Sequence, residues 1–435
     1  MLECFRLVHV NTSVDRTHQA SLLRPYRFGQ FRPERSPWRH NAKANMALWP
    51  IAVLVVLQRV FVMGANGGIT DDYSTVYEAL RRAIDGVPIY SEDYSSVVPH
   101  YLYNPGATLL LMPLAWTEQI QTARLLFIVL NAVCIVLGLW LLVKLFGFRA
   151  QSCVLPASII IAFQTESVQN TLIFSNINGV LFLGLIGFLW AVLNNRKGAA
   201  GVILGFMVLI KPVFAPLLFI PLVLMWWQPF ASSAAVIIGL NIPGFLFLPG
   251  TGEYLTRTVP YLRIVRDYAN TSLRGMGVYF DTPAWIIYPL WIAFALLALA
   301  GLAALLKLRE SEPLLWISCT SSLLLVSAFF LSSLGQMYYS MMLFPLLFTV
   351  LLPRSPMHNP FAWIGAFLCL SAPEWYSNFW DWLNPSRFFE LFRGTYGWGM
   401  LIIVVAVTAI TWAYESSKAK HSPVRATTPP KPAEA

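Results

Sequence analysis

Charged residues are scarce in this chain of 435 residues: Asp, Glu, Lys and Arg make up 12% of the sequence, and hydrophobic residues 57%. A soluble domain has no water-free interior large enough to bury that much apolar surface, so lipid must be the solvent. Apolar runs recur from Leu48 to Tyr414 and leave no stretch long enough for a separate soluble domain. Neither a G-x-G-x-x-G nor a Walker loop is present, which excludes an appended nucleotide-binding domain.

Residues that ligate metals or form disulfides are also few. The chain has five cysteines and six histidines, without C-x-x-C or H-E-x-x-H spacing. Four cysteines stand in apolar runs and are interpreted as small hydrophobic residues: Cys134, Cys153, Cys319 and Cys369. Only one histidine, His100, stands in a segment expected to face outward. We therefore expect no metal site, no disulfide and no cofactor.

The net charge of +9 is concentrated in the two ends of the chain. In a membrane protein such basic tails are a topology signal, which argues against a nucleic-acid partner. Residues 1–45 lack the apolar core of a signal peptide, so we expect a disordered cytoplasmic tail or a stretch upstream of a true start at Met46. Residues 46–414 are the expected transmembrane domain, and 415–435 a second basic tail.

The apolar runs predict an all-α polytopic membrane protein with about 10–12 transmembrane helices. Lys and Arg gather on the connections assigned to the cytoplasm, so we expect both termini on the cytoplasmic side of the plasma membrane. Segments 65–105, 250–283 and 373–395 then face outward, so we expect the site on that side. The expected spans are 46–64, 122–146, 152–170, 172–193, 198–211, 213–228, 231–249, 284–307, 313–333, 338–352, 360–372 and 396–414.

Two acids, Asp71 and Asp72, follow the first expected span. The next residues, Tyr73 to Ile84, place Val76, Tyr77 and Leu80 on one helical face, which predicts an amphipathic helix in the membrane interface. Thr70 or Asp71 would cap this helix, so both acids have a purely structural interpretation as capping residues. The alternative is that one carboxylate, preferably Asp72, accepts a proton from an acceptor hydroxyl at the edge of the outer leaflet.

Other polar side chains stand at expected helix ends on the same outward side. Lys211 precedes Pro212 at a helix break within membrane depth, where an ammonium can hold a lipid phosphate or can extend to the nearest phospholipid. Amides and acids at helix ends can bind sugar hydroxyls or cross-link helices, and tyrosines can stack on a sugar or anchor the interface. The candidate substrate ligands besides Lys211 are His100, Tyr103, Asn176, Asn178, Glu166, Arg266, Asp267, Arg274, Tyr338 and Tyr339.

At these residues the chain resembles the GT-C glycosyltransferases and, within them, glycosyltransferase family 87. The resemblance covers about residues 46–414. It is carried by NGGITDDY (66–73), PHYLYNPGATLL (99–110), FSNINGV (174–180), LIKPVFAPLLF (209–219), TRTVPYLRIVRDYANTSLRGMGVYF (256–280), GQMYYSMMLFP (335–345) and TYGW (395–398).

The resemblance is strongest to the members that make α-(1→3) branches in actinobacterial arabinan. It implies a GT-C bundle and an inverting transfer of arabinofuranose from decaprenyl-phospho-arabinose to the 3-hydroxyl of cell-wall arabinan. The implied base lies in the first outer loop, at Asp71 or Asp72. Mannosyltransferases of the family tend to have a shorter spacing from their aspartate to Val-Tyr, and a His-His pair where this chain has Tyr338 and Tyr339.

Two alternatives stay open. One is a mannosyltransferase that uses a polyprenyl-phosphomannose donor, and the other is a flippase or transporter of a lipid-linked sugar. A transporter would need ionisable residues along a path through the bilayer, and here Arg59 is the exception to their gathering on one side. The sequence does not predict the oligomeric state.

Overall fold

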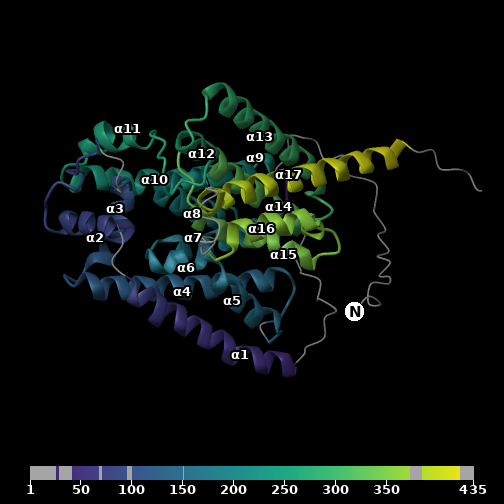
Figure 1. The fold of residues 1–435 in the computed structure, drawn as a ribbon, viewed down its shortest axis with the longest axis horizontal. Coiled ribbons are helices and arrows are strands. Elements are labelled where there is room, and N and C mark those ends of the chain that lie inside the picture. Colours follow the sequence, from purple (N-terminus) through teal and green to yellow (C-terminus); the bar gives the residue numbers. More distant parts are fainter. Residues whose placement is uncertain are drawn as a thin grey trace, which may run out of the picture.

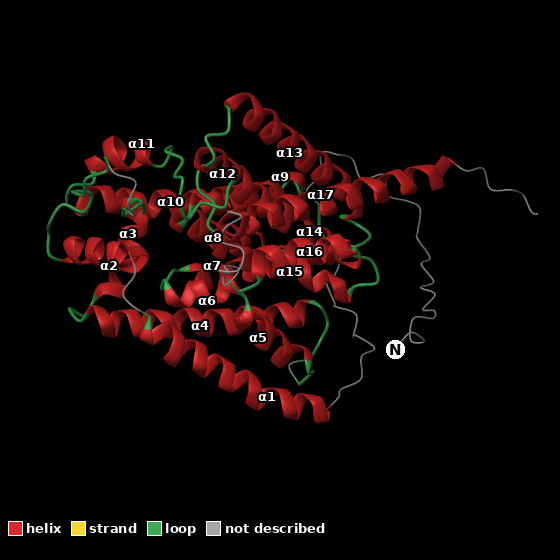
Figure 2. Ribbon diagram, viewed as in Figure 1, coloured by secondary structure: helices red, strands yellow, loops and turns green. Residues whose placement is uncertain are grey.

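The computed structural model describes residues 26–28, 42–67, 71–95, 100–149, 151–372 and 385–421. These residues form helices joined by loops, without a strand among them (Figure 2). Six helices are long and apolar enough to cross a bilayer. They are Ala42–Gly64 (α1, Ala42–Leu57, continued by a π-helical turn), Ile120–Leu145 (α4), Trp227–Phe247 (α10), Ala284–Leu308 (α13, Ala284–Leu305, with a 3-10 turn), Pro313–Leu331 (α14) and Leu391–Lys418 within α17 (Pro385–His421). The chain is a polytopic membrane protein, as predicted.

Shorter apolar helices occupy the other expected spans, and one more, α3, lies between the first two of the expected spans. The expected span 152–170 is divided at Thr165, whose extended backbone separates two helices. The extended backbone of Lys211, before Pro212, separates the helix Lys197–Ile210 from the 3-10 turn Pro212–Leu218. This confirms the helix break predicted at Lys211. These helices are α3 (Pro105–Leu111), α5 (Val154–Gln164), α6 (Glu166–Ile173), α7 (Asn178–Leu193), α8 (Lys197–Ile210), α9 (Phe219–Val223), α15 (Phe344–Phe348) and α16 (Pro360–Leu370), with 3-10 turns at Met112–Ala115, Pro212–Leu218, Met337–Leu343, Thr349–Leu351 and Pro356–His358.

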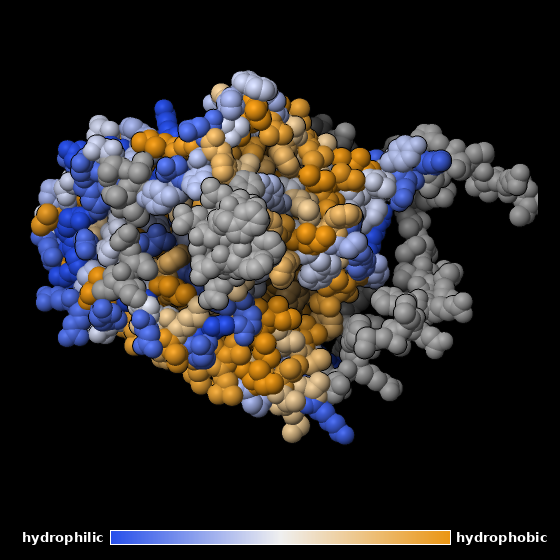
Figure 3. All heavy atoms as spheres, in the orientation of Figure 1, coloured by the Kyte–Doolittle hydropathy of each residue, from blue (hydrophilic) through white to orange (hydrophobic). Residues whose placement is uncertain are grey.

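One end of the bundle is hydrophilic. It carries α2 (Asp71–Ile84), a π-helical turn at Tyr254–Thr258 and α11 (Val259–Tyr261), whereas α12 (Leu273–Tyr279) lies nearer the middle of the bundle (Figure 1). Figure 3 shows polar side chains gathered at this end, whereas apolar side chains cover the surface over α1, α4 and α5. A polar end beside an apolar belt is the surface expected of a protein that spans a bilayer and works at one face.

Helix α2 confirms the predicted amphipathic helix. Tyr73, Tyr77 and Leu80 are buried against the bundle, and the Tyr77 hydroxyl donates to the carbonyl oxygen of Thr117 over 2.7 Å. The helix begins at Asp71, so the Asp72 carboxylate lies in its first turn, where the helix dipole favours a negative charge. Thr70, one of the two expected caps, lies outside the described residues.

A close contact between α3 and α10 supports the loop that precedes α3. Asn104 caps α3 by accepting from the backbone N–H of Ala107 over 2.9 Å, and its amide donates to the carbonyl of Leu209 over 2.7 Å. A Cβ at Gly106 would lie 2.7 Å from the backbone nitrogen of Asn241 on α10. Glycine is therefore required there for the two backbones to approach.

The last helix begins earlier than the sequence indicates. Helix α17 starts at Pro385, whereas the segment 373–395 is expected to be a loop and the span to start at 396. Its first turns contribute Arg393, which is buried and pairs with Glu166 at the start of α6. This contact between residues 227 positions apart stabilises a polar helical start that no local apolar period indicates.

Candidate active site

A cavity of about 390 Å³ lies at the hydrophilic end of the bundle. Its wall combines α2, the loop before α3, the break between α8 and the following 3-10 turn, and the segments around 176, 261 and 336. Segments far apart in the chain therefore converge on one site. The predicted base Asp72 and seven of the predicted ligands line it: His100, Tyr103, Asn176, Lys211, Arg266, Tyr338 and Tyr339.

Lys211 is one of two strongly basic side chains, with Arg266, that line the cavity. Its ammonium donates to the side-chain oxygens of Asn176 and Asn178, each over 3.0 Å. It also lies 4.7 Å from the centre of the Tyr339 ring, within the range of a cation–π contact. None of the ion pairs among the described residues includes Lys211. Because an ammonium has three protons, one N–H remains for an anionic ligand in the cavity.

Asn178 is buried at the first position of α7, and its neighbour explains how α7 is held. A Cβ at Gly179 would lie 2.6 Å from the backbone oxygen of Asn131 on α4, and the Gly179 N–H donates to the Asn131 side chain over 2.9 Å. The start of α7 is thus locked against α4. The Asn178 oxygen, one of the two that hold Lys211, is consequently positioned by a rigid helix.

A chain of hydrogen bonds connects Lys211 to Asp72. The Asn176 amide, whose oxygen accepts from Lys211, donates to the Tyr338 hydroxyl over 3.1 Å. That hydroxyl lies 3.2 Å from the Asp72 carboxylate, to which it donates. The Tyr338 hydroxyl also contacts the side-chain oxygen of Gln336, which accepts from Tyr339 over 3.2 Å. The cation and the carboxylate therefore share one network and face one cavity.

Tyr103 and His100 form the side of the cavity nearest the loop before α3. The pKa of Tyr103 is raised, first by burial and then by neighbouring Tyr339 and Asp72, so the phenol stays protonated as a hydrogen-bond donor. The His100 imidazole lies 3.3 Å from the Glu92 carboxylate and 5.0 Å, centre to centre, from the Tyr261 ring. Glu92 and Tyr261 thus hold the His100 ring where it lines the cavity.

Arg266 is the one predicted residue of 250–283 that the structure brings to the cavity; its side chain is buried. Arg274 and the exposed Asp267 are not among the lining residues. Glu166 lies against Arg393 and also accepts from Asn170 over 3.0 Å, so it connects helices. The side chain of Asp71 lies outside the described residues.

Several polar residues that line the cavity, and one that supports it from outside, are absent from the sequence-based list. Gln336 and Asn104 stand in the quoted sequence blocks and line the cavity. Arg124 is buried in α4; one of its terminal nitrogens donates to the carbonyls of Gly64 and Ile173 over 2.8 and 2.9 Å. It thereby ties the chain leading to Asp72 to the chain leading to Asn176. Its signal is an arginine inside an expected span.

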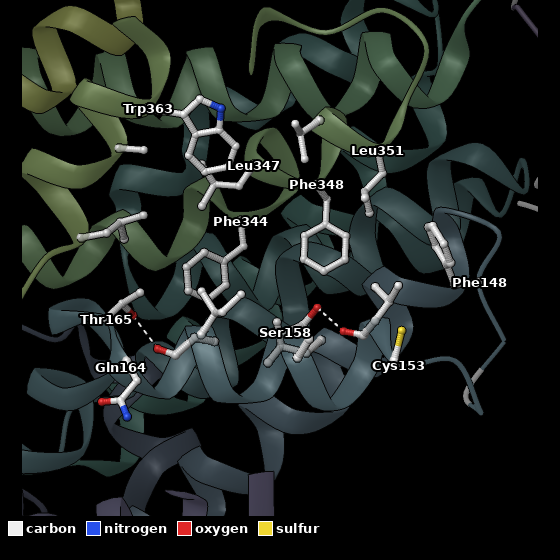
Figure 4. A pocket seen from close by; sticks show the side chains of 18 of the residues that line it. Phe148, Cys153, Ser158, Gln164, Thr165, Phe344, Leu347, Phe348, Leu351 and Trp363 are labelled. Atoms are coloured by element: carbon white, nitrogen blue, oxygen red, sulfur yellow. Dashed lines mark hydrogen bonds between the residues drawn. The ribbon is translucent and has the colours of Figure 1, made fainter. Parts of the chain in front are cut away.

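A larger cavity of about 860 Å³ lies elsewhere, among α1, α4, α5, α15 and α16 (Figure 4). The figure shows Phe344, Phe348 and Trp363 facing it. Its few polar groups include Ser158 and Thr165, whose hydroxyls donate to backbone carbonyls of their own helix segment. No acid, lysine, arginine or histidine is among its lining residues, so of these two cavities only the smaller has charged side chains in its wall.

The smaller cavity combines the groups needed for a single displacement at carbon in which a phosphate is the leaving group. A carboxylate can accept a proton, and an ammonium and a guanidinium can stabilise a departing phosphate. Neutral amide and phenol groups between them can orient hydroxyls. The cavity itself lies within the ordinary range of about 300–1,000 Å³ for small-molecule sites.

Comparison with known proteins gives one consistent result. The model of glycosyltransferase family 87 matches residues 101–333. The chain is 46% identical over 393 residues to an α-(1→3)-arabinofuranosyltransferase of Corynebacterium glutamicum, covering 90% of this chain and 93% of that protein. It is 38% identical to proteins of the same name from Mycolicibacterium smegmatis (86% and 87% covered) and Mycobacterium tuberculosis (90% and 90%).

Proposed function

Because the chain belongs to glycosyltransferase family 87 and is a glycosyltransferase, we propose that it transfers arabinofuranose from a polyprenyl-phosphate donor to the 3-hydroxyl of an arabinan acceptor. The names of its relatives support the sugar and the linkage. The observation that carries the donor class is Lys211 facing the same cavity as Asp72 without a carboxylate partner of its own. A lysine ammonium acts as a compact point charge and can hold a single phosphate group.

The proposed reaction is a single displacement. Asp72 takes the proton of the acceptor 3-hydroxyl, and the hydroxyl oxygen attacks the anomeric carbon from the face opposite the phosphate. The bond from that carbon to the phosphate oxygen breaks, and its electron pair leaves with the polyprenyl phosphate. One displacement inverts the anomeric configuration, in contrast to a two-step route through a covalent intermediate.

Each charged group has one task in this reaction. The Lys211 ammonium and the Arg266 guanidinium stabilise the negative charge that develops on the leaving phosphate. Tyr338 orients the Asp72 carboxylate through the hydrogen bond of 3.2 Å. The remaining polar groups, Tyr103 and Gln336, are placed to bind hydroxyls of the two sugars.

In this proposal the protein spans the plasma membrane. The hydrophilic end of the bundle faces out of the cell, and both termini lie in the cytoplasm. A lipid-linked donor reaches the cavity from the bilayer, and a cell-wall acceptor reaches it from the water side. Basic residues at the two ends of the chain support this orientation.

The donor is tested by supplying membranes that contain the chain with one radiolabelled polyprenyl-phosphate sugar at a time. We expect the arabinose donor to be consumed and the label to appear in 3-linked branches, identified by linkage analysis. Consumption of the mannose donor instead would make the protein a mannosyltransferase. Movement of a labelled lipid-linked sugar across vesicles without new glycosidic bonds would make it a transporter, and either result would overturn the proposal.

A further inference from the structure

A second crevice opens beside the cavity at the hydrophilic end of the bundle. It measures about 560 Å³ and lies between the segments 91–95 and 256–264. It shares two residues with the cavity, Tyr261 and Ile264. The two hollows therefore adjoin each other along one wall that belongs to the lining of both.

That wall is aromatic. The ring centres of Tyr94 and His100 lie 4.8 Å apart, those of His100 and Tyr261 5.0 Å, and those of Tyr94 and Tyr261 5.6 Å. His100 lines the cavity, Tyr94 lines the crevice, and Tyr261 lines both. A sugar ring packs its C–H face on an aromatic ring and keeps its hydroxyls free for polar groups at the rim.

The wall is held rigidly from behind. The Glu92 carboxylate accepts from Arg82 over 2.7 Å and from the backbone N–H of Tyr101 over 3.0 Å, and lies 3.3 Å from His100. The Tyr94 hydroxyl donates to the carbonyl of Tyr101 over 2.8 Å. A surface that is already ordered loses little entropy when it binds a ligand.

The charges of the crevice fit a neutral ligand. Glu92 is paired as described, and Arg257 lies 3.6 Å from Glu253. Asp93 is exposed, so its carboxylate is negative at neutral pH and repels phosphate. Hydrogen bonds from Ser95 lower its pKa further. Hydroxyl groups, in contrast, can donate to this carboxylate. The crevice thus differs in charge from the cavity, where Lys211 and Arg266 are positioned for an anion.

From this juxtaposition we infer that the crevice binds the acceptor glycan, holding the units next to the sugar that receives the branch. The inference rests on the proposed function, because a branching enzyme modifies a sugar inside a chain. Only one acceptor unit has its hydroxyl at Asp72, so the neighbouring units must leave the cavity. These units lie along the wall of Tyr94, His100 and Tyr261, which leads from the cavity into the crevice.

The test measures how the rate depends on acceptor length. Membranes containing the full chain receive labelled arabinose donor and neutral arabinofuranosides of one, three or five units, and KM and kcat are determined for each. Tyr94→Ala should raise KM for the five-unit acceptor about 5- to 10-fold, the effect of losing one aromatic contact, with kcat and the donor KM unchanged. The single-unit acceptor should show no such change.

Two further variants keep the test decisive. Asp93→Ala alters an exposed position of the crevice, so the protein should fold normally and the KM for the five-unit acceptor should rise. This variant keeps the test valid if Tyr94→Ala reduces the amount of folded protein. Tyr288→Ala removes a tyrosine that is 56% exposed on α13, outside the crevice, and should behave as wild type.

The outcomes separate the two proposals. Equal acceptor-length profiles for wild type, Tyr94→Ala and Asp93→Ala, in membranes that transfer arabinose, would overturn the crevice and leave the proposed function intact. A raised donor KM in place of a raised acceptor KM would also overturn it, because the crevice would then hold the lipid. Absence of arabinose transfer by the wild type to any acceptor would overturn both.

Discussion

Replacing Lys211 with methionine keeps a long unbranched side chain and removes the positive charge and its three donors. Two of those donors hold Asn176 and Asn178 at 3.0 Å, and the third is free for the donor phosphate. The loss of one preorganised group that stabilises developing charge costs about 10²–10³ in kcat, or about 2.7–4 kcal/mol. We expect Lys211→Met to lower kcat by that factor, and Lys211→Arg to recover part of it.

The assay compares initial rates over a range of labelled polyprenyl-phospho-arabinose concentrations, so that kcat and KM are separated. The matched control is Arg263→Met, which removes a positive charge from an exposed residue that does not line the cavity. Since Lys211→Met leaves a buried asparagine oxygen without its donor, a thermal unfolding curve in detergent must show that the variant is folded at the assay temperature. A folded Lys211→Met variant with the rate of Arg263→Met would refute the assigned role.

Three other changes have defined outcomes. Arg393→Met leaves Glu166 buried without its partner and should lower stability by about 3–5 kcal/mol, measured as denaturant unfolding of the solubilised protein, whereas an unchanged midpoint would show that the pair contributes nothing. Gly106→Ala pushes a methyl group into the backbone of α10 and should cost about 1–3 kcal/mol, while Gly239→Ala, with open space around it, should not lower stability. Tyr338→Phe keeps the ring and removes the hydroxyl that orients the carboxylate, so kcat should fall about 10-fold with little change in melting temperature; full activity would remove that hydroxyl from the account.

The structure confirms two structural predictions that rest on local sequence. The apolar period of residues 73–84 predicts α2, and a lysine before a proline in an uncharged stretch predicts the break at Lys211. Polar residues at several helix ends predict a shared site, and most of them line one cavity. These features can be predicted from sequence because an apolar period and a proline determine the structure of the residues next to them.

The features that sequence does not indicate depend on contacts between distant segments. Glu166 pairs with Arg393 in a helix that begins as early as Pro385, and Glu166 is not among the residues that line the cavity. Arg124 ties together the two chain segments that carry Asp72 and Asn176, yet in the sequence it is a single charge in an apolar run. Neither partner can be identified without the packing of the whole bundle.

The most direct test of the central claim is the transfer rate of two matched variants, Asp72→Asn and Asp71→Asn, assayed in membranes with labelled arabinose donor. Asparagine keeps the size of the side chain and removes its ability to take a proton. The account predicts that Asp72→Asn loses transfer by about 10²–10⁴, the range of general base catalysis, while donor binding persists and Asp71→Asn remains active. Full transfer by Asp72→Asn, with or without loss in Asp71→Asn, would contradict it.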